Sequence, residues 1–245
     1  MITMAGQQTW QWPSRIALVA EHTESNLYHL GKRCLDVILA GLALIVLLPL
    51  LLLITILIML DSPGTVVFTQ KRVGAKRQRL GRQAIWVIQD FTMYKFRSMI
   101  ENADSSVHEA YIREFVEGRA QATEESGGKF KLTNDPRVTR IGRFLRKFSL
   151  DELPQLLNVL KGDMSLVGPR PVPPYEVACY GNGHHKRLAA LPGITGYWQV
   201  KGRCQVSFEE MIRMDLEYIR NASFGYDLKI LFLTIPAVLS RRGAE

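Results

Sequence analysis

The sequence predicts a mainly helical α+β domain that one apolar helix attaches to a membrane. Residues 37–60 contain no charged side chain, and these roughly 24 residues exceed the roughly 20 that a helix needs to cross a bilayer. Two strand-like runs, 65–70 and 84–88, flank a Gly- and Arg-rich link and predict a small β-hairpin. Amphipathic helical segments follow. We expect a monotopic membrane protein with a kinked re-entrant N-terminal membrane helix, this hairpin and interfacial amphipathic helices.

Composition limits the remaining possibilities. The 245 residues suffice for one substantial domain and an appendage, which we place as a variable extension (1–30), a membrane helix (31–61) and a cytosolic catalytic domain (62–245). There are 31 Lys and Arg against 23 Asp and Glu, a net charge of +8, so the surface should attract polyanions. The scattered cysteines Cys34, Cys179 and Cys204 form no C-x-x-C pair and favour a reducing compartment.

Charge also bears on how the apolar segment sits in the membrane. Lys32 and Arg33 precede it and six basic residues follow within 71–82, so both flanks favour the cytoplasmic side. A re-entrant helix satisfies both flanks, whereas a straight spanning helix does not, and Pro49 supplies a cause for the kink. Asp36 is most simply paired with Lys32 or Arg33. A signal peptide fits less well, because the run is long and begins about 30 residues in.

The rest of the chain reads as helices and loops. The segment 99–131 is polar and helical in character and breaks at 125–128, the expected flexible loop. Asp135-Pro136 should open a helix with a buried face (Val138, Ile141, Leu145, Phe148) and a basic stripe (Arg137, Arg140, Arg143, Lys147). A capping box at 207–210 starts another helix, and the apolar tail 228–239, which contains Pro236, suits an interface or the core.

Two adjacent carboxylates mark the candidate chemistry. Asp151 and Glu152 follow the basic helix and precede Pro154, so a new helix should begin within a turn of them, and helix starts favour anions. Arg146 and Arg170 could hold phosphates. A carboxylate can attack phosphorus, and Mg²⁺ bound by Asp151 and Glu152 would neutralise a diphosphate. The alternative is structural, because 149–152 also reads as a capping box.

Several motifs occur in order between residues 30 and 240. They are the basic-flanked membrane segment with Pro49, 70–74 (QKRVG), 94–99 (YKFRSM), 135–142 (DPRVTRIG), 149–155 (SLDELPQ), 162–171 (GDMSLVGPRP) and 192–200 (PGITGYWQV). With these motifs the sequence resembles the bacterial sugar transferases, the monotopic phosphoglycosyl transferases that act on polyprenyl phosphate.

The resemblance implies a ping-pong transfer of a sugar-1-phosphate from a UDP-sugar to undecaprenyl phosphate, releasing UMP, as a first membrane step of exopolysaccharide or other glycoconjugate assembly. It implies a bacterial inner-membrane enzyme facing the cytoplasm. Asp151 would be the covalent nucleophile and Glu152 would help bind Mg²⁺. The substrate-binding candidates are Arg146, Arg170, Arg97, Lys71 and Gln199, although Lys71 could instead touch lipid headgroups and Gln199 could complete a turn.

Two departures and several alternatives stay open. The motif 196–199 reads GYWQ where many relatives have Trp-Ala, and the segment 104–131 is longer than in the smallest members. A non-enzymatic membrane adaptor is the rival from another class, although no nucleic-acid module is recognised. A multi-span transferase conflicts with the single long apolar segment. His184-His185 reads as surface rather than metal site, and Tyr197-Trp198 as core, interface or a uracil stack. The sugar, with UDP-glucose and UDP-galactose as first guesses, and the oligomeric state stay undetermined.

Overall fold

The computed structural model describes residues 17–19, 26–80, 83–120, 135–181, 183–202 and 205–239. Its elements in chain order are β1 (Ala17–Val19), α1 (Asn26–Asp61), β2 (Val67–Leu80), β3 (Gln83–Phe96), α2 (Ser106–Val116), α3 (Arg140–Lys147), the 3₁₀ turn η1 (Leu150–Glu152), α4 (Gln155–Lys161), β4 (Ser165–Val167), α5 (Pro174–Val177), the 3₁₀ turn η2 (His184–Leu188), β5 (Gly193–Thr195), α6 (Tyr197–Lys201), α7 (Phe208–Asn221) and α8 (Phe224–Leu239). The fold is mostly helical, with two small sheets of order β1-β3-β2 and β4-β5.

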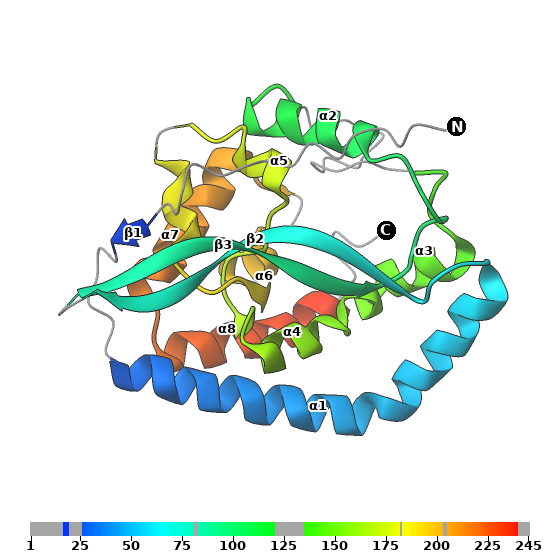
Figure 1. Ribbon diagram of the computed structural model, residues 1–245, viewed down its shortest axis with the longest axis horizontal. Helices are drawn as coiled ribbons and strands as arrows, with labels where there is room; N and C mark the ends of the chain where they lie inside the picture. The colour runs from blue at the N-terminus through cyan, green and yellow to red at the C-terminus, as the bar shows by residue number, and fades with distance from the viewer. Residues whose placement is uncertain are drawn as a thin grey trace.

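A long hairpin of β2 and β3 crosses the middle of the molecule, with α2 on one side and α1 on the other (Figure 1). The predicted hairpin is confirmed, but its strands continue through the basic stretch that showed no strand pattern. The buried residues of β3 change face along its length, from Trp86 and Ile88 to Phe91 and Met93. Two-stranded ribbons twist strongly, so opposite faces of this ribbon meet the core at its two ends. The buried residues of β3 therefore do not follow a single alternating pattern along the whole strand.

Helix α1 is long, apolar and largely exposed. It has 36 residues, and only 11% of its most apolar window is buried, so it is not the core helix of a soluble protein. It begins at Asn26, before the expected start at residue 31, because tertiary contacts hold its first turns. Pro49 lies inside the helix, which changes direction along its length in Figure 1. These features indicate a membrane protein.

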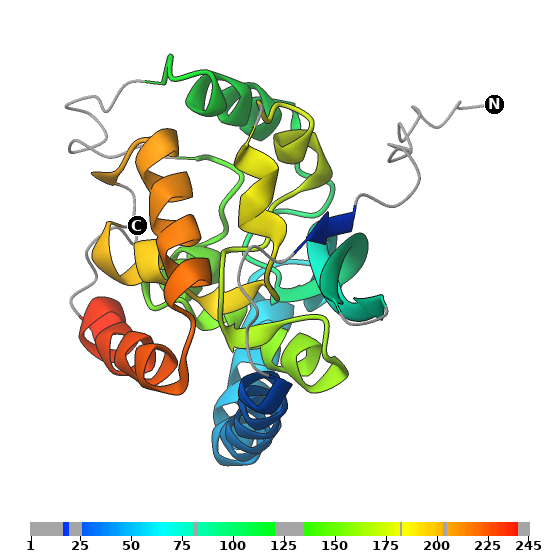
Figure 2. The same cartoon turned by 90° about the vertical axis from the view of Figure 1, so that its left-hand side faces the viewer.

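Both halves of α1 pack on the same domain. In the first half, Ala40 packs with Leu156 and Val159 of α4, while in the second half Ile54 and Ile58 pack with Phe96 and Leu145. Figure 2, viewed from the end, shows α1 and α2 at opposite ends of the molecule with the hairpin and α7 between them. The hairpin between α1 and α2 carries two of the motifs that the sequence analysis singled out, 70–74 in β2 and the start of 94–99 in β3.

Three local expectations can be compared with the structure. The helix expected to open at Asp135-Pro136 begins only at Arg140, where the Thr139 hydroxyl accepts a hydrogen bond from the Gly142 amide; the predicted start was wrong. Arg137 therefore lies outside the exposed basic stripe, which keeps Arg140, Arg143 and Lys147. The Ser207 cap of α7 is confirmed. The apolar tail forms α8, and the expected loop at 125–128 lies outside the described residues.

Candidate active site

The two carboxylates lie in a sharp turn between α3 and α4. Ser149 adopts a left-handed conformation (φ 57°), which reverses the chain after the last turn of α3 and is uncommon for a residue with a side chain. Its hydroxyl makes no capping hydrogen bond, so the capping-box interpretation is wrong. Asp151 and Glu152 follow in η1, and α4 begins at Gln155. Helix α4 has only seven residues, so side chains must supply the positive charge here.

Glu152 is held by two cations from different parts of the fold. Its Oε1 accepts hydrogen bonds from Lys95 Nζ at 3.0 Å and from Arg170 Nη2 at 3.1 Å. Burial acts to raise the pKa of Glu152, but these two charges outweigh it and lower that pKa to about 2. Glu152 is therefore ionised at neutral pH.

Asp151 is held differently from its neighbour. It is 8% exposed, and no described residue donates a hydrogen bond to its carboxylate or forms an ion pair with it. Burial raises the pKa of Asp151, while Lys95, Arg146 and Arg170 act against that rise. In this pair, Glu152 is hydrogen-bonded to two cations, whereas the Asp151 carboxylate has no such partner among the described residues. Their different environments move the two pKa values in opposite directions, as in sites where two acids have separate roles.

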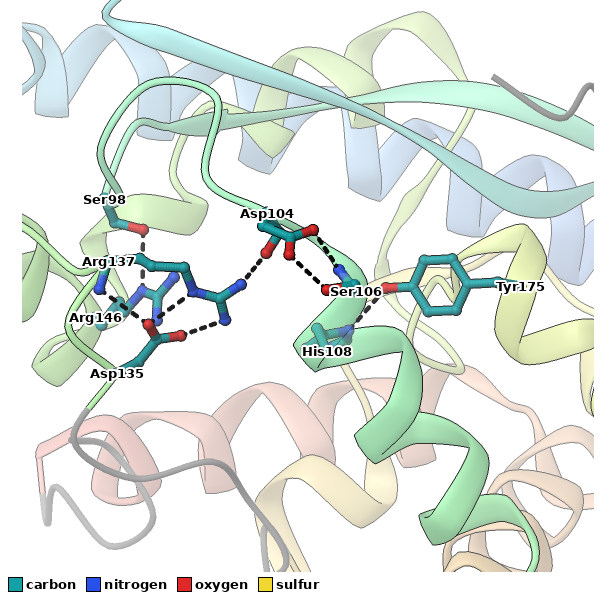
Figure 3. Close-up of polar contacts among 8 residues, drawn as sticks. All are labelled: Ser98, Asp104, Ser106, His108, Asp135, Arg137, Arg146 and Tyr175. Atoms are coloured by element: carbon teal, nitrogen blue, oxygen red, sulfur yellow. Dashed lines mark hydrogen bonds and ion pairs between the residues drawn. The ribbon is translucent and has the colours of Figure 1, made fainter. Parts of the chain in front are cut away.

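Backbone contacts fix the element that carries Arg146. The Nε of Arg146 donates to Ser98 Oγ at 3.0 Å (Figure 3), and the Thr139 amide donates to the Ser98 carbonyl at 3.1 Å. A Cβ on Gly142 would lie 2.0 Å from that same carbonyl oxygen, so only glycine allows α3 to approach this backbone so closely. The DPRVTRIG motif is thereby explained as a docking surface for the Ser98 segment.

Lys95 is placed by a buried asparagine. Strand β1 pairs with β3 at residues 85–87, and no described strand pairs with this edge of β3 at residues 92–94. Asn158 fills that place: its Oδ1 accepts from the Tyr94 amide at 3.0 Å and its Nδ2 donates to the Thr92 carbonyl at 2.7 Å. Because Asn158 is fully buried in α4, it fixes the strand position next to Lys95 relative to the turn that holds Glu152.

Arg170 is placed by the second sheet. Strands β4 and β5 pair in parallel, and the Gly168 amide donates to the Thr195 carbonyl while the Gly193 amide donates to the Pro169 carbonyl. A Cβ on Gly193 would lie 2.1 Å from the Gly168 nitrogen, so the two backbones approach closely only because of the glycines. The GPRP and PGITG motifs are therefore one structural unit that carries Arg170 to Glu152.

A further cationic group adjoins this pair. We call Arg72, Lys95, Arg146 and Arg170 the cationic cluster. Burial and the charge of Arg170 lower the pKa of Arg72 to about 10. Burial and four nearby arginines lower the pKa of His108 to about 4, so this imidazole is neutral. His108 Nδ1 lies 2.7 Å from the hydroxyl of Tyr175 (Figure 3), and burial raises the pKa of that phenol to about 12. With both groups neutral, the phenol can donate to Nδ1, and in that arrangement Nε2 carries the imidazole proton.

Arg137 joins the two ends of the segment between β3 and α3. Its Nε and Nη2 donate to the two carboxylate oxygens of Asp135 at 2.8 and 2.6 Å, and its Nη1 donates to the Asp104 carbonyl (Figure 3). The Asp104 carboxylate accepts from the Ser106 amide at the start of α2. Arg137 thus fixes the position from which α2 carries His108 toward the cationic cluster.

The structure brings only part of the predicted set together. Arg97 is buried at the end of α1, where its guanidinium donates to the carbonyls of Ile58, Ser62 and Pro63; it links helix and domain, and its substrate role stays a prediction. Lys71 is exposed on β2. Gln199 Nε2 donates to the Ile194 carbonyl, which completes the turn after β5.

Sequence reasoning missed Lys95, Arg72, His108 and Tyr175 as members of the site. Lys95 and Arg72 lie in motifs that were recognised, but which basic residue of each motif faces the carboxylates depends on the strand register. Among the described residues there is no group of three or more His, Cys, Asp or Glu that could hold a metal ion, and His184 pairs with Glu209. Tyr197 packs on Tyr226 and Trp198 against a core cluster.

Magnesium, which the resemblance implies, is compatible with this donor set. Mg²⁺ commonly takes one or two carboxylates and completes its shell with water and substrate phosphates. Asp151 has an uncommitted carboxylate, and Glu152 adjoins it with one oxygen engaged by the two cations. These two side chains could therefore hold the ion together with a diphosphate, and not as a closed protein cage.

Comparisons with known proteins identify the family. The profile of the family described as bacterial sugar transferase matches residues 27–241. The exopolysaccharide production protein ExoY of Sinorhizobium fredii is 42% identical over 88% of this chain and 88% of its own length. The UDP-galactose-lipid carrier transferase of Erwinia amylovora is 44% identical over 92% of this chain and 43% of its own. The undecaprenyl-phosphate galactose phosphotransferase of Salmonella typhimurium is 41% identical over 87% and 41%.

The chain thus spans nearly all of one relative and about two fifths of the two longer ones. The matched residues include the hairpin, the carboxylate turn and both glycine-dependent contacts described above. The protein belongs to the bacterial sugar transferase family.

Proposed function

We propose that the protein transfers a sugar-1-phosphate from a UDP-sugar to undecaprenyl phosphate through a covalent phosphosugar on Asp151. Transfer of a sugar phosphate to a lipid carrier in exopolysaccharide synthesis is supported by the family and by the relatives' names. The observation that carries the covalent step is the contrast between the two carboxylates. Glu152 is clamped by Lys95 and Arg170, whereas Asp151 is uncommitted and buried beside the same cations.

The proposed reaction has two half-reactions. In the first, a carboxylate oxygen of Asp151 attacks the β-phosphorus of the UDP-sugar; the new O–P bond forms as the bond from that phosphorus to the bridging oxygen breaks, and UMP leaves. In the second, a phosphate oxygen of undecaprenyl phosphate attacks the same phosphorus and the Asp151 O–P bond breaks. Asp151 is restored, and the product is a lipid diphosphate sugar. The phosphosugar is thus accepted first by Asp151 and then by undecaprenyl phosphate at the same site.

The cationic cluster supplies the electrostatic part of this mechanism. Lys95, Arg146 and Arg170 act on Asp151, and phosphoryl transfer depends chiefly on positioning and on stabilising charge spread over phosphate oxygens. The cluster also favours the ionised, nucleophilic form of Asp151 against the effect of burial. Bound Mg²⁺ would neutralise further charge on the diphosphate. We also propose substrate contacts by Arg97, Lys71 and Gln199, although in the described part of the chain these three side chains form no hydrogen bond or ion pair with Asp151 or Glu152.

We infer that α1 enters and leaves the membrane on one side. Its first half is tied to α4 and α8, and its second half to α3 and to Arg97, so both halves contact one domain. A straight crossing would separate its ends by about 30 Å of hydrocarbon. The catalytic domain would then face the cytoplasm at the bacterial inner membrane, as the basic flanks favour.

The proposed interfacial surface lies on helices next to α1. Phe232 and Ile235 of α8 are 69% and 59% exposed, and Phe144 of α3 is exposed beside Arg140 and Arg143. Apolar side chains beside basic ones suit the boundary between headgroups and acyl chains. This placement would bring the site to the level of the lipid phosphate.

The test is UMP release from a panel of UDP-sugars by the detergent-solubilised protein with Mg²⁺ and undecaprenyl phosphate. UDP-galactose and UDP-glucose come first, because two of the relatives are named for galactose. We expect Asp151→Asn to lower the rate by at least about 1,000-fold, since the nucleophile is lost. Asp163→Asn, in the neighbouring motif near Lys76, is the matched control and should retain activity.

A second measurement separates the covalent step from simple catalysis. Wild-type protein incubated with a donor radiolabelled in the sugar, without lipid, should retain label after denaturation and lose it to hydroxylamine, as an acyl phosphate does. Asp151→Asn should retain none. Unchanged UMP release in Asp151→Asn contradicts the covalent aspartate, and release from no donor supports the membrane-adaptor alternative.

A further inference from the structure

One edge of strand β4 pairs with no other described strand. A side chain of α1 forms a hydrogen bond with that edge instead. On its other edge β4 pairs with β5 through the Ser165 and Gly168 amides. The Leu166 amide points the other way, where Asp36 Oδ1 accepts its hydrogen bond at 3.0 Å. Asp36 is 3% exposed, so this charged group lies inside the protein and not at a membrane surface. The expected pairing of Asp36 with Lys32 or Arg33 was wrong, because both of those residues are used elsewhere.

The same face of α1 fixes the elements on either side of β4. Arg33 donates from both terminal nitrogens to the Val159 and Leu160 carbonyls, in the last turn of α4. Lys32 Nζ lies 2.8 Å from the Asp227 carboxylate of α8. Two polar side chains of α1, Arg33 and Asp36, therefore hold the segment that begins with the catalytic turn and ends with Arg170, and Lys32 ties the same face of α1 to α8.

A second path supports β4 from the α7 side. The Tyr218 hydroxyl lies 2.8 Å from Asp227 Oδ1 and 3.1 Å from the Val167 carbonyl, so its single proton is shared between them. Asp227 also accepts from the Tyr28 hydroxyl at 2.9 Å. Asp36 differs from these residues in one respect, because it alone bonds directly to a β4 amide from α1.

The position of β4 determines where Arg170 stands. Val167 ends the strand, and the glycine-dependent turn 168–169 leads directly to Arg170, whose Nη2 contacts Glu152 at 3.1 Å. Asn158 supports Lys95 in the same manner, by completing the β3 edge. Lys95 thus lies in a strand, and Arg170 follows one, whose edge is completed by a buried polar side chain from another element.

We propose that Asp36 is a positioning residue for Arg170, so that the membrane helix is part of the catalytic apparatus and not only an anchor. The proposal rests on the proposed function, because Arg170 matters as a phosphate and Glu152 contact. A residue that acts only through Arg170 has nothing left to influence once Arg170 is removed. A residue that merely stabilises the fold lowers activity by the same factor whether Arg170 is present or not.

The test is a double-mutant cycle on kcat/KM for UMP release. We expect Asp36→Leu to lower kcat/KM by about 10- to 100-fold and Arg170→Met by about 100-fold. The double variant should be no worse than Arg170→Met within about threefold. Losses that multiply in the double variant overturn the proposal. If Asp36→Leu does not fold, Asp36→Ala removes the acceptor without adding volume and takes its place.

Two controls distinguish position from charge and from stability. Asp36→Asn keeps an oxygen that accepts from the Leu166 amide and should retain kcat/KM within about threefold. Tyr28→Phe removes a hydrogen bond from the same network without contacting β4, and its effect should multiply with that of Arg170→Met. A loss in Asp36→Asn as large as in Asp36→Leu overturns a positioning role based on this hydrogen bond.

Amide hydrogen exchange of the peptide 165–171 needs no turnover, so it separates this proposal from the proposed function. Asp36→Leu should exchange there at least about 10-fold faster than wild type, while Asp36→Asn and Tyr28→Phe should not. Faster exchange with no UMP release from wild type removes the proposed function but leaves the support of β4 by Asp36. Unchanged exchange in Asp36→Leu overturns the proposal even when wild type is active.

Discussion

Two arginine clusters in this molecule contain the same chemical groups but are built differently. Arg187 is 1% exposed and lies 2.6 Å from Asp215, 3.2 Å from Glu176 and 2.7 Å from the Tyr180 hydroxyl. The side chain of Arg170 is 38% exposed, and it shares Glu152 with Lys95. The Arg187 cluster has one cation against two acids, whereas the active site sets the four residues of the cationic cluster against Asp151 and Glu152.

The ratio of cations to acids distinguishes a structural ion cluster from a binding site for anions. Around Arg187 both acids belong to the chain, and they join α5, η2 and α7. Around Arg170 the cations outnumber the acids; burial, followed by the charges of neighbouring arginines, lowers the pKa values of Arg72 and His108. An anionic ligand would offset this excess of positive charge, which is why we propose that a phosphate binds here.

The largest effect should come from replacing the central arginine of each cluster with methionine. Arg187→Met leaves two buried acids without their cation and should cost about 3–5 kcal/mol of unfolding free energy. That loss corresponds to a fall in melting temperature of about 10 °C. Arg170→Met should leave the melting temperature within about 2 °C and lower kcat/KM about 100-fold, as expected for a lost transition-state contact. Thermal unfolding in detergent and UMP release measure the two effects.

The comparison breaks if the two variants exchange phenotypes. A large loss of stability in Arg170→Met would mean that the active-site cluster holds the fold together. A normal melting temperature in Arg187→Met would mean that Glu176 and Asp215 find other partners.

The sequence predicted the carboxylate pair and Arg146 and Arg170, because these lie in short motifs whose spacing limits their position. It could not choose Lys95 over Arg97, since both are basic residues of one motif and only the end of β3 decides their directions. Lys95 meets Glu152, while Arg97 turns to the carbonyls at the end of α1. His108 had no motif at all, and its place depends on the Arg137 contacts that position α2.

The fold was predictable where local pattern and tertiary context agree. The apolar helix, the Ser207 cap and the existence of the hairpin follow from local signals. The full length of the hairpin does not, because the basic stretch 71–79 gains strand structure from pairing with β3. The late start of α3 has a similar cause: residues 137–139 bond to the backbone around Ser98 and Ile100, which leaves them unable to join the helix.

An intermediate effect should appear in the pH dependence of the active-site cluster. In wild type the pKa of Glu152 is about 2, so it stays ionised from pH 5 to 8. Lys95→Gln removes a charge that lowers the pKa of Glu152 and of Asp151, while burial continues to raise both. Carboxylates ionise above their pKa, so the acidic limb of kcat/KM should move to higher pH. Between pH 8 and 5.5 the variant should lose about tenfold more activity than wild type.

Lys161→Gln is the matched control for that profile. Lys161 is exposed and lies over the ring of Tyr94, the residue before Lys95 in β3, and among the described residues it forms no ion pair with Asp151 or Glu152. Its removal should leave the acidic limb in place. An unmoved limb in Lys95→Gln would mean that neither carboxylate needs Lys95 to stay ionised.

The smallest effect should come from removing one phenol hydroxyl in each cluster. Tyr180→Phe takes a hydrogen bond from Glu176 and from Arg187 and should cost about 1–2 kcal/mol of stability, with kcat/KM unchanged. Tyr175→Phe takes the donor from His108 Nδ1, so the imidazole loses the bond that fixes its proton on Nε2. We expect the donor KM to rise about fivefold with no change in melting temperature, because a neutral hydrogen bond contributes about 1 kcal/mol.

Steady-state kinetics and thermal unfolding of both variants decide the matter. The Tyr→Phe substitution should therefore have a different effect in each cluster. At Tyr180 both hydrogen-bond partners of the hydroxyl belong to the protein, so the free energy of unfolding should decrease. At Tyr175 the partner is an imidazole beside the arginines of the proposed phosphate site, so we expect the loss to fall on binding. A stability loss at Tyr175 equal to that at Tyr180 would instead assign α2 and α5 a structural contact and remove His108 from the proposed donor site.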